Sequence, residues 1–128
     1  MLLIGDGAAQ MTVQELSTVA RQDLRATVIV LDNDGYTVER AIHGPEQPYN
    51  DIAAWDWTAF GAVFAATGAP VTTTRAATTG ELASALAAAA TAPGLTLIQA
   101  TLPPLDVPPL LTALARAAAA ANTRRTVS

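Results

Sequence analysis

Short apolar runs that break into glycine and polar residues recur along the chain. Residues 2–5 read Leu-Leu-Ile-Gly, and residues 27–31 read Thr-Val-Ile-Val-Leu before a turn of Asp, Asn and Gly. Two further runs, at 71–74 and 95–101, follow breaks that contain glycine and proline. Buried parallel strands have this appearance as they enter and leave a sheet. The pattern therefore predicts four strands.

Helical segments are predicted between these strands. Thr12 and Thr78 are each followed three residues later by glutamate, which is the pattern of a capping box at the start of a helix. Asp56 is placed to cap a third helix. The predicted helices cover residues 12–21, 37–42 and 58–66, the alanine-rich segment from Thr78 to before Pro93, and a last segment from Asp106 onward. This alternation implies an α/β fold with three layers, in which a parallel sheet lies between helices.

The stretch from Gly5 to Glu39 organises the predicted site. If its two strands are neighbours joined by the intervening helix, they form a right-handed strand-helix-strand unit. Asp6 and Asn33 then lie side by side at the carboxyl edge of the sheet, where open α/β sheets bind ligands.

The polar groups at this edge suit a hard metal ion. Asp6 offers a carboxylate, Asn33 an amide carbonyl and Gly35 a backbone carbonyl, and three such oxygens favour Mg²⁺ or Ca²⁺ over zinc. Gly5 and Gly7 let the backbone approach a diphosphate closely. The site is interpreted as metal plus diphosphate, and the alternative is an ordinary strand-to-helix turn that contains Gly-Asp-Gly. The residues alone leave both interpretations open.

Composition and charge exclude several classes of protein. The 11 acidic and 7 basic residues give a formal charge of −4, which argues against a nucleic-acid surface. The chain has no cysteine, which excludes disulfides, thiolate catalysis and zinc-thiolate sites. The uncharged span from Leu82 to Leu105 is interrupted by Pro93-Gly94, and no signal peptide is visible. We expect a cytoplasmic protein without a membrane segment.

Five linked motifs lie between residue 2 and about residue 60. They are Gly-Asp-Gly at 5–7, Gln-Glu-Leu-Ser-Thr at 14–18, Asn-Asp-Gly-Tyr-Thr-Val-Glu at 33–39, Ile-His-Gly-Pro-Glu at 42–46 and Tyr-Asn-Asp-Ile at 49–52. Together they resemble the motifs of thiamine-diphosphate (ThDP) enzymes, and within them those of the pyruvate and indolepyruvate decarboxylase branch. The resemblance implies a Mg²⁺ ion held by Asp6, Asn33 and the Gly35 carbonyl, which anchors the diphosphate of ThDP. The cofactor contacts that it implies are Gly5, Asp6, Gly7, Ala8, Ala9, Asn33, Gly35, Tyr36 and Thr37.

Two positions depart from the motifs of that branch. Asp32 stands where an asparagine is usual, and it adds a charge next to the predicted ligand Asn33. Ala8 stands where a serine hydroxyl often reaches the diphosphate, so only backbone contact remains there.

Glu39 is the predicted catalytic residue. The resemblance implies that it lies beside the reactive carbon of ThDP and takes part in decarboxylation and in the protonation that follows. A carboxyl group shielded from water is suited to donating a proton. The alternative is a solvated glutamate that stabilises the start of a helix. His43, the only histidine, lies in the predicted turn His43-Gly44-Pro45 and is interpreted as a structural loop residue. It therefore cannot replace the histidine pair that the resemblance implies in a pyrimidine-binding domain.

The resemblance also implies that residues 1–128 form a partial ThDP-binding domain. We expect the carboxyl-terminal piece of a longer, oligomeric enzyme that decarboxylates a 2-keto acid, such as indolepyruvate, to an aldehyde. The pyrimidine-binding and middle domains of that family are not in this sequence, so the isolated chain is expected to be inactive. The alternative is a non-catalytic ThDP-binding or interaction module that a separate partner chain completes.

Overall fold

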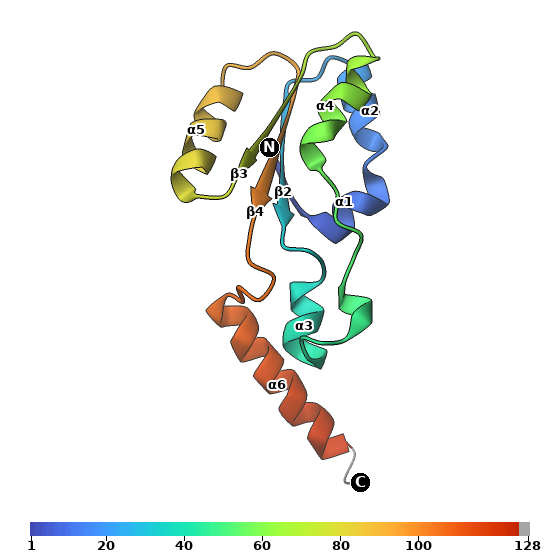
Figure 1. Cartoon of the computed structure of the whole chain (residues 1–128). Coiled ribbons are helices and arrows are strands. Elements are labelled where there is room, and N and C mark those ends of the chain that lie inside the picture. Colours follow the sequence, from blue (N-terminus) through green and yellow to red (C-terminus); the bar gives the residue numbers. More distant parts are fainter. Residues whose placement is uncertain (126–128) are drawn as a thin grey trace. The chain divides into compact units, whose positions relative to one another are not determined.

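A computed structural model describes residues 1–125 of the chain (Figure 1). Its contacts divide the chain into two compact units. Unit 1 consists of Met1–Asp32 and Ala54–Leu102, and unit 2 consists of Asn33–Ala53 and the chain from Pro103 onward.

The core of unit 1 is a parallel sheet of four strands among the described residues. In space the strands follow the order β1-β2-β4-β3, and every neighbouring pair is parallel. Their bounds are β1 Leu2–Gly5, β2 Ala26–Asp32, β3 Val71–Ala76 and β4 Leu95–Thr101. The predicted α/β class is confirmed, and β1 and β2 are neighbours, which was the condition for the strand-helix-strand unit.

Helices cover both faces of this sheet. Figure 1 shows α1, α2 and α4 on one side of the strands and α5 on the other. Consecutive residues of a strand point to opposite faces, so Val28 and Val30 pack on the first side while Ile29 packs toward α5. Unit 1 therefore has the three predicted layers. The helix bounds are α1 Asp6–Thr12, α2 Glu15–Arg21, the short 3-10 helix η2 Trp57–Ala59, α4 Phe60–Ala65 and α5 Thr79–Ala89.

The prediction for the first helix is wrong at its start. The chain is already helical at Asp6, and Thr12 is the last residue of α1, where its hydroxyl donates to the carbonyl of Ala8 at 3.4 Å. An N-cap residue needs an extended backbone, which Thr12 does not have inside α1. The cap of α2 is instead Gln14, without a side-chain hydrogen bond.

The second capping box is formed as predicted, and it makes the stability of α5 depend on pH. The Oε2 atom of Glu81 accepts from the amides of Ala77 at 2.8 Å and Thr78 at 3.0 Å, and the Thr78 hydroxyl accepts from the Glu81 amide. These bonds, with the Ala77 amide first, hold the pKa of Glu81 below its ordinary value of 4.5. A carboxyl whose pKa falls on folding stabilises the fold above its ordinary pKa and loses that effect as pH falls further.

Glutamine keeps an oxygen that can accept from these amides but has no charge, so Glu81→Gln should lower the melting temperature at pH 7 by only about 1 to 3 °C. The difference from the parent chain should shrink as pH falls below 4.5. Thermal unfolding between pH 7 and pH 3 measures this. Glu15→Gln is the matched control, because Glu15 is also in a first helical turn but its helix has no side-chain cap. An equal, pH-independent effect of both substitutions would contradict the prediction.

Unit 2 contains three helices among its described residues. They are α3 Thr37–His43, the short 3-10 helix η1 Pro48–Asn50 and α6 Pro109–Arg125. Helix α3 packs against α6, and the Thr37 hydroxyl donates to the carbonyl of Pro104 at 3.0 Å. Within residues 1–125, no helix combines the length and the apolar character needed to cross a membrane.

Candidate functional site

The carboxyl end of β1 leads directly into the predicted metal ligand Asp6. Asp6 is only 2% exposed, and its Oδ1 atom accepts from the amide of Gly7 at 2.8 Å. Gly5 pairs with Leu31 in the sheet, so Asp6 and Asp32 each follow a paired position on neighbouring strands. A side chain at Gly5 would meet no other atom within 4 Å, so the space beside this turn is open.

The two alanines after Gly7 have different surroundings. Ala8 is exposed, whereas Ala9 is 6% exposed and packs in the hydrophobic core of unit 1. Because the side chain of Ala9 packs in the core, this residue can contact a cofactor only through its backbone.

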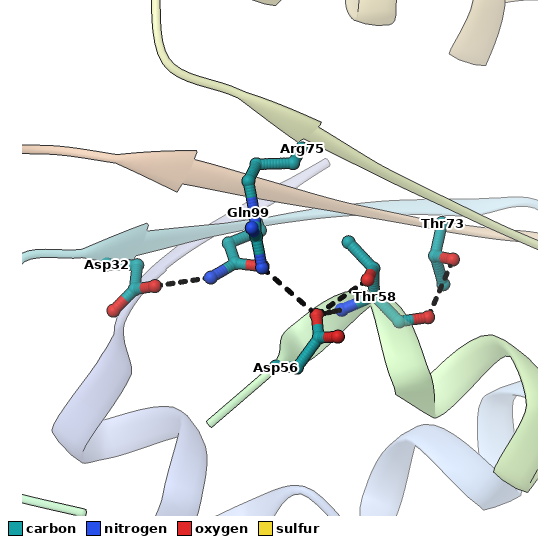
Figure 2. A network of polar contacts seen from close by, with 6 residues as sticks. All are labelled: Asp32, Asp56, Thr58, Thr73, Arg75 and Gln99. Atoms are coloured by element: carbon teal, nitrogen blue, oxygen red, sulfur yellow. Dashed lines mark hydrogen bonds and ion pairs between the residues drawn. The ribbon is translucent and has the colours of Figure 1, made fainter. Parts of the chain in front are cut away.

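A network of polar side chains crosses the sheet near its carboxyl edge (Figure 2). The side-chain amide of Gln99 on β4 donates to Oδ2 of Asp32 on β2 at 2.5 Å. Arg75 on β3 donates from Nε to Oε1 of Gln99 at 3.2 Å, and from Nη2 to Oδ1 of Asp56 at 3.2 Å. Because Arg75 occupies the amide oxygen of Gln99, the NH₂ group of Gln99 faces Asp32.

This network explains how the chain accommodates Asp32, the acidic residue that departs from the resemblance. The carboxylate has a fixed donor in Gln99, which is 4% exposed. A buried polar side chain needs such a partner. Sequence reasoning missed Gln99 and Arg75, although glutamine within an otherwise apolar strand was a visible signal.

Asp56 lies at the other end of the network and is a cap residue, as predicted, but the predicted helix 58–66 is divided into η2, which Asp56 caps, and α4. The Oδ1 atom of Asp56 accepts from the hydroxyl of Thr58 at 2.6 Å and from the Thr58 amide at 3.1 Å. The Thr58 hydroxyl, more than Arg75, lowers the pKa of Asp56 below its ordinary value of 3.8. The Thr73 hydroxyl ties η2 to β3 by donating to the carbonyl of Thr58 at 2.8 Å (Figure 2).

The loop that carries Asn33 and Gly35 belongs to unit 2. Asp34 and Gly35 both have positive φ, at 57° and 132°. A Cβ atom at Gly35 would lie 2.1 Å from the carbonyl oxygen of Asn50, so this position requires glycine. The next amide, of Tyr36, donates to the same oxygen at 2.9 Å.

Arg40 on α3 contacts this loop directly. Its guanidinium donates to the backbone carbonyls of Asn33 at 3.1 Å and Asp34 at 2.5 Å, and to Oδ1 of Asp51 at 2.9 Å. Sequence reasoning placed Arg40 on the helix and assigned it no role.

The predicted catalytic residue Glu39 lies in the first turn of α3. Its side chain is 46% exposed, so the described residues do not shield it from water. Its Oε2 atom lies 3.4 Å from Nε2 of His43, one helical turn later. The interpretation of His43 as a loop residue is wrong: it is the last residue of α3, because the helix extends one residue beyond Ile42.

The predicted site residues fall into both units. Unit 1 holds Asp6 and the neighbouring contacts Gly5, Gly7, Ala8 and Ala9, whereas unit 2 holds Asn33, Gly35, Tyr36, Thr37 and Glu39. The side-by-side placement of Asp6 and Asn33, like the roles of all these residues, stays a prediction.

The predicted donor set fits Mg²⁺ by its chemistry. No cluster of three His, Cys, Asp or Glu side chains occurs among residues 1–125. The predicted set instead combines one carboxylate with an amide and a backbone carbonyl. Magnesium commonly takes few protein ligands and completes its shell with phosphate and water.

Two curated proteins share about half of their matched residues with this chain. The mycobacterial proteins named "Alpha-keto-acid decarboxylase" from Mycobacterium tuberculosis (strain ATCC 25618 / H37Rv) and Mycobacterium leprae (strain TN) are 50% and 48% identical over 112 and 124 residues. These matches cover 87% and 95% of this chain but only 20% and 21% of the relatives. The chain thus spans about a fifth of the length of these curated relatives.

Solved structures of longer enzymes show the same fold. One is the Rhodococcus jostii RHA1 thiamine diphosphate-dependent 4-hydroxybenzoylformate decarboxylase. The match covers 80% of this chain and 19% of the decarboxylase chain, with a TM-score of 0.64 and 26% identity. Benzoylformate decarboxylase from Polynucleobacter necessarius has a TM-score of 0.69 over 80% of this chain and 19% of its own, and at 23% identity it shows the fold alone. The sequence model described as "Thiamine pyrophosphate enzyme, C-terminal TPP binding domain" matches residues 1–100. The chain belongs to this family of C-terminal TPP-binding domains.

Proposed function

We propose that this chain is the diphosphate-anchoring part of a ThDP- and Mg²⁺-dependent decarboxylase that converts a 2-keto acid to an aldehyde and CO₂. The observation that carries the proposal is 50% identity to alpha-keto-acid decarboxylases over 87% of the chain. Indolepyruvate or a related keto acid is the proposed substrate, from the resemblance of the motifs between residues 2 and 60.

In this proposal Asp6, Asn33 and the Gly35 carbonyl bind Mg²⁺. Three features support it. Asp6 is buried at the carboxyl edge of the sheet, the space beside Gly5 is open, and the Asn33–Gly35 loop adopts a conformation that requires glycine. The backbone of residues 5–9 would meet the diphosphate, and Tyr36 and Thr37 would contact the cofactor from the second loop.

When bound, ThDP supplies a thiazolium that acts as nucleophile and electron sink. The proposed role of Glu39 is to hold a proton near the substrate and to donate it after CO₂ has left. That role requires a carboxyl group shielded from water, and Glu39 is 46% exposed in this chain. We therefore propose that other segments, or a second subunit, cover Glu39 in the active assembly.

A second candidate is a non-catalytic ThDP-binding module completed by a separate chain. The edge strand β1 favours a partner of some kind, because it pairs within the described residues only with β2 and leaves Leu2 and Leu3 49% and 60% exposed. The proposed partner in an active enzyme is a second copy of the same protein or the remaining domains.

Calorimetric titration of the purified chain with ThDP in excess Mg²⁺ tests the anchor. Binding that EDTA removes is the expected signature of the Mg²⁺-diphosphate site. A chimera tests the activity: this chain replaces the matching segment of the Mycobacterium tuberculosis relative, and CO₂ release from 2-keto acids is measured. A folded chimera that binds ThDP without releasing CO₂ would favour the non-catalytic module, and one that fails to bind ThDP would contradict both candidates.

A further inference from the structure

We propose that Arg40 is a positioning residue, which holds the Asn33–Gly35 loop in the conformation that presents its metal ligands. The consequence for Mg²⁺ rests on the proposed function. The role of Arg40 in ordering the loop rests on contacts within unit 2 alone.

The burial of Arg40 indicates that its charge has a structural purpose. The side chain is 6% exposed, and a buried cation is costly unless hydrogen bonds and an opposite charge surround it. Here the guanidinium has three acceptors, and two of them are backbone carbonyls of consecutive loop residues, Asn33 and Asp34. The third is the carboxylate of Asp51, which is 70% exposed and so contributes a more screened attraction.

The geometry of the loop explains why such a support is needed. Asp34 and Gly35 both occupy the positive-φ region, which a non-glycine residue such as Asp34 adopts only at a cost in free energy. The rigid planar fork of arginine bonds the two carbonyls at once and thereby orients two successive peptide planes. Lysine has the charge but lacks this fork.

The loop is also held at its other end. The amide of Arg40 donates to the carbonyl of Tyr36 at 2.9 Å, so Arg40 is bonded to residues on both sides of Gly35. Across from it, the Tyr36 amide donates to the carbonyl of Asn50. A Cβ atom added to Gly35 would lie 2.1 Å from that carbonyl oxygen and 2.9 Å from Nη2 of Arg40. Both the guanidinium and the Asn50 carbonyl therefore lie close to the Cα atom of Gly35.

In this arrangement the backbone carbonyl and the side-chain amide of Asn33 have different roles. Its backbone carbonyl accepts from Arg40, which leaves its side-chain amide as the group for the proposed metal contact. Loss of the guanidinium fork would release the peptide planes of Asn33 and Asp34, and the loop would then have to be ordered again each time Mg²⁺ binds.

Amide hydrogen exchange on the purified chain tests the ordering role without any ligand. Arg40→Lys keeps the charge and should speed exchange of the Tyr36 amide about tenfold, with α6 amides unchanged. Asp51→Asn keeps an acceptor oxygen for Nη2 and should have a smaller effect. Arg75→Lys, the same substitution in unit 1, should leave the loop unchanged. Parent-like exchange at Tyr36 in Arg40→Lys, or an equal loss of protection throughout α6, would overturn the proposal.

A Mg²⁺ titration at fixed ThDP tests the consequence for the metal. Arg40→Lys should raise the Mg²⁺ concentration at half-saturation about tenfold, through the free-energy cost of ordering the loop, whereas Arg75→Lys should not. An unchanged Mg²⁺ requirement together with faster loop exchange would overturn the link to the metal site. If the parent chain binds no ThDP, the proposal that the isolated chain anchors the cofactor is wrong. Hydrogen exchange still decides whether Arg40 orders the loop.

Discussion

Asp6→Ala is expected to abolish Mg²⁺-dependent ThDP binding, with a loss of affinity of at least about 100-fold. Asp6 is the sole carboxylate of the proposed ligand set, and a divalent ion needs negative charge to offset the loss of its water shell. The residue is 2% exposed and directly follows β1. Calorimetric titration with ThDP, in the chain or in the chimera, measures the effect.

Asp32→Asn is the matched control for Asp6. Asp32 follows Leu31, the residue that pairs with Gly5, so it is at the position on β2 that corresponds to Asp6. Its carboxylate accepts from Gln99, and the proposed ligand is the following residue, Asn33. An asparagine side chain keeps an oxygen that can accept from Gln99. Binding should therefore survive in Asp32→Asn and be lost in Asp6→Ala. Circular dichroism separates lost binding from misfolding, and normal ThDP affinity in a folded Asp6 variant would refute the metal assignment.

Glu39→Gln is expected to leave ThDP binding unchanged and to lower the turnover of the chimera by about 100- to 10,000-fold, the usual range for loss of a general acid or base. Glutamine has nearly the size and hydrogen-bonding capacity of glutamate but has no proton of suitable acidity to donate. Its side chain takes no part in the proposed ligand set, so the binding step should not change. Steady-state rates of aldehyde formation, with ThDP affinity measured in parallel, distinguish the two effects.

Glu46→Gln provides the comparison for Glu39. Glu46 is an exposed glutamate in the turn after α3, and it has no proposed role in binding or catalysis. Its replacement removes one negative charge from the same unit and should leave turnover near that of the parent chimera. Full activity of the Glu39 variant, or an equal loss in both variants, would show that Glu39 is not the proton donor.

Local patterns in the sequence were sufficient for most of the secondary structure. The strand at Leu95–Thr101 has the predicted bounds, since an apolar run between proline breaks leaves few alternatives. The capping box of Thr78 and Glu81 formed because its partners lie three residues apart and need no other part of the chain. The same pattern at Thr12 failed because helix α1 had already begun at Asp6, which left Thr12 no extended backbone for a cap.

The candidate site could be predicted only in part. Gly-Asp-Gly and Asn33 with Gly35 were recognised because each motif is contiguous and is typical of a known family. The partners that hold these motifs were not recognised. Arg40 reaches the loop from the following helix, and no spacing rule specifies that a helical arginine turns back to two carbonyls of the preceding loop. The pairing of Glu39 with His43 likewise depended on α3 extending to residue 43.

By itself, the sequence determined the α/β class, the order of the strands and helices along the chain, and the likeness to ThDP enzymes, because these depend on periodicity and on contiguous motifs. The tertiary structure alone decided the spatial order β1-β2-β4-β3 and the partners of the polar residues at its carboxyl edge. Gln99 and Asp32 are 67 residues apart, and Arg75 and Gln99 are 24 apart. Such bonds form only where strand pairing brings distant residues together, and strand pairing is set by how the whole sheet buries its two apolar faces.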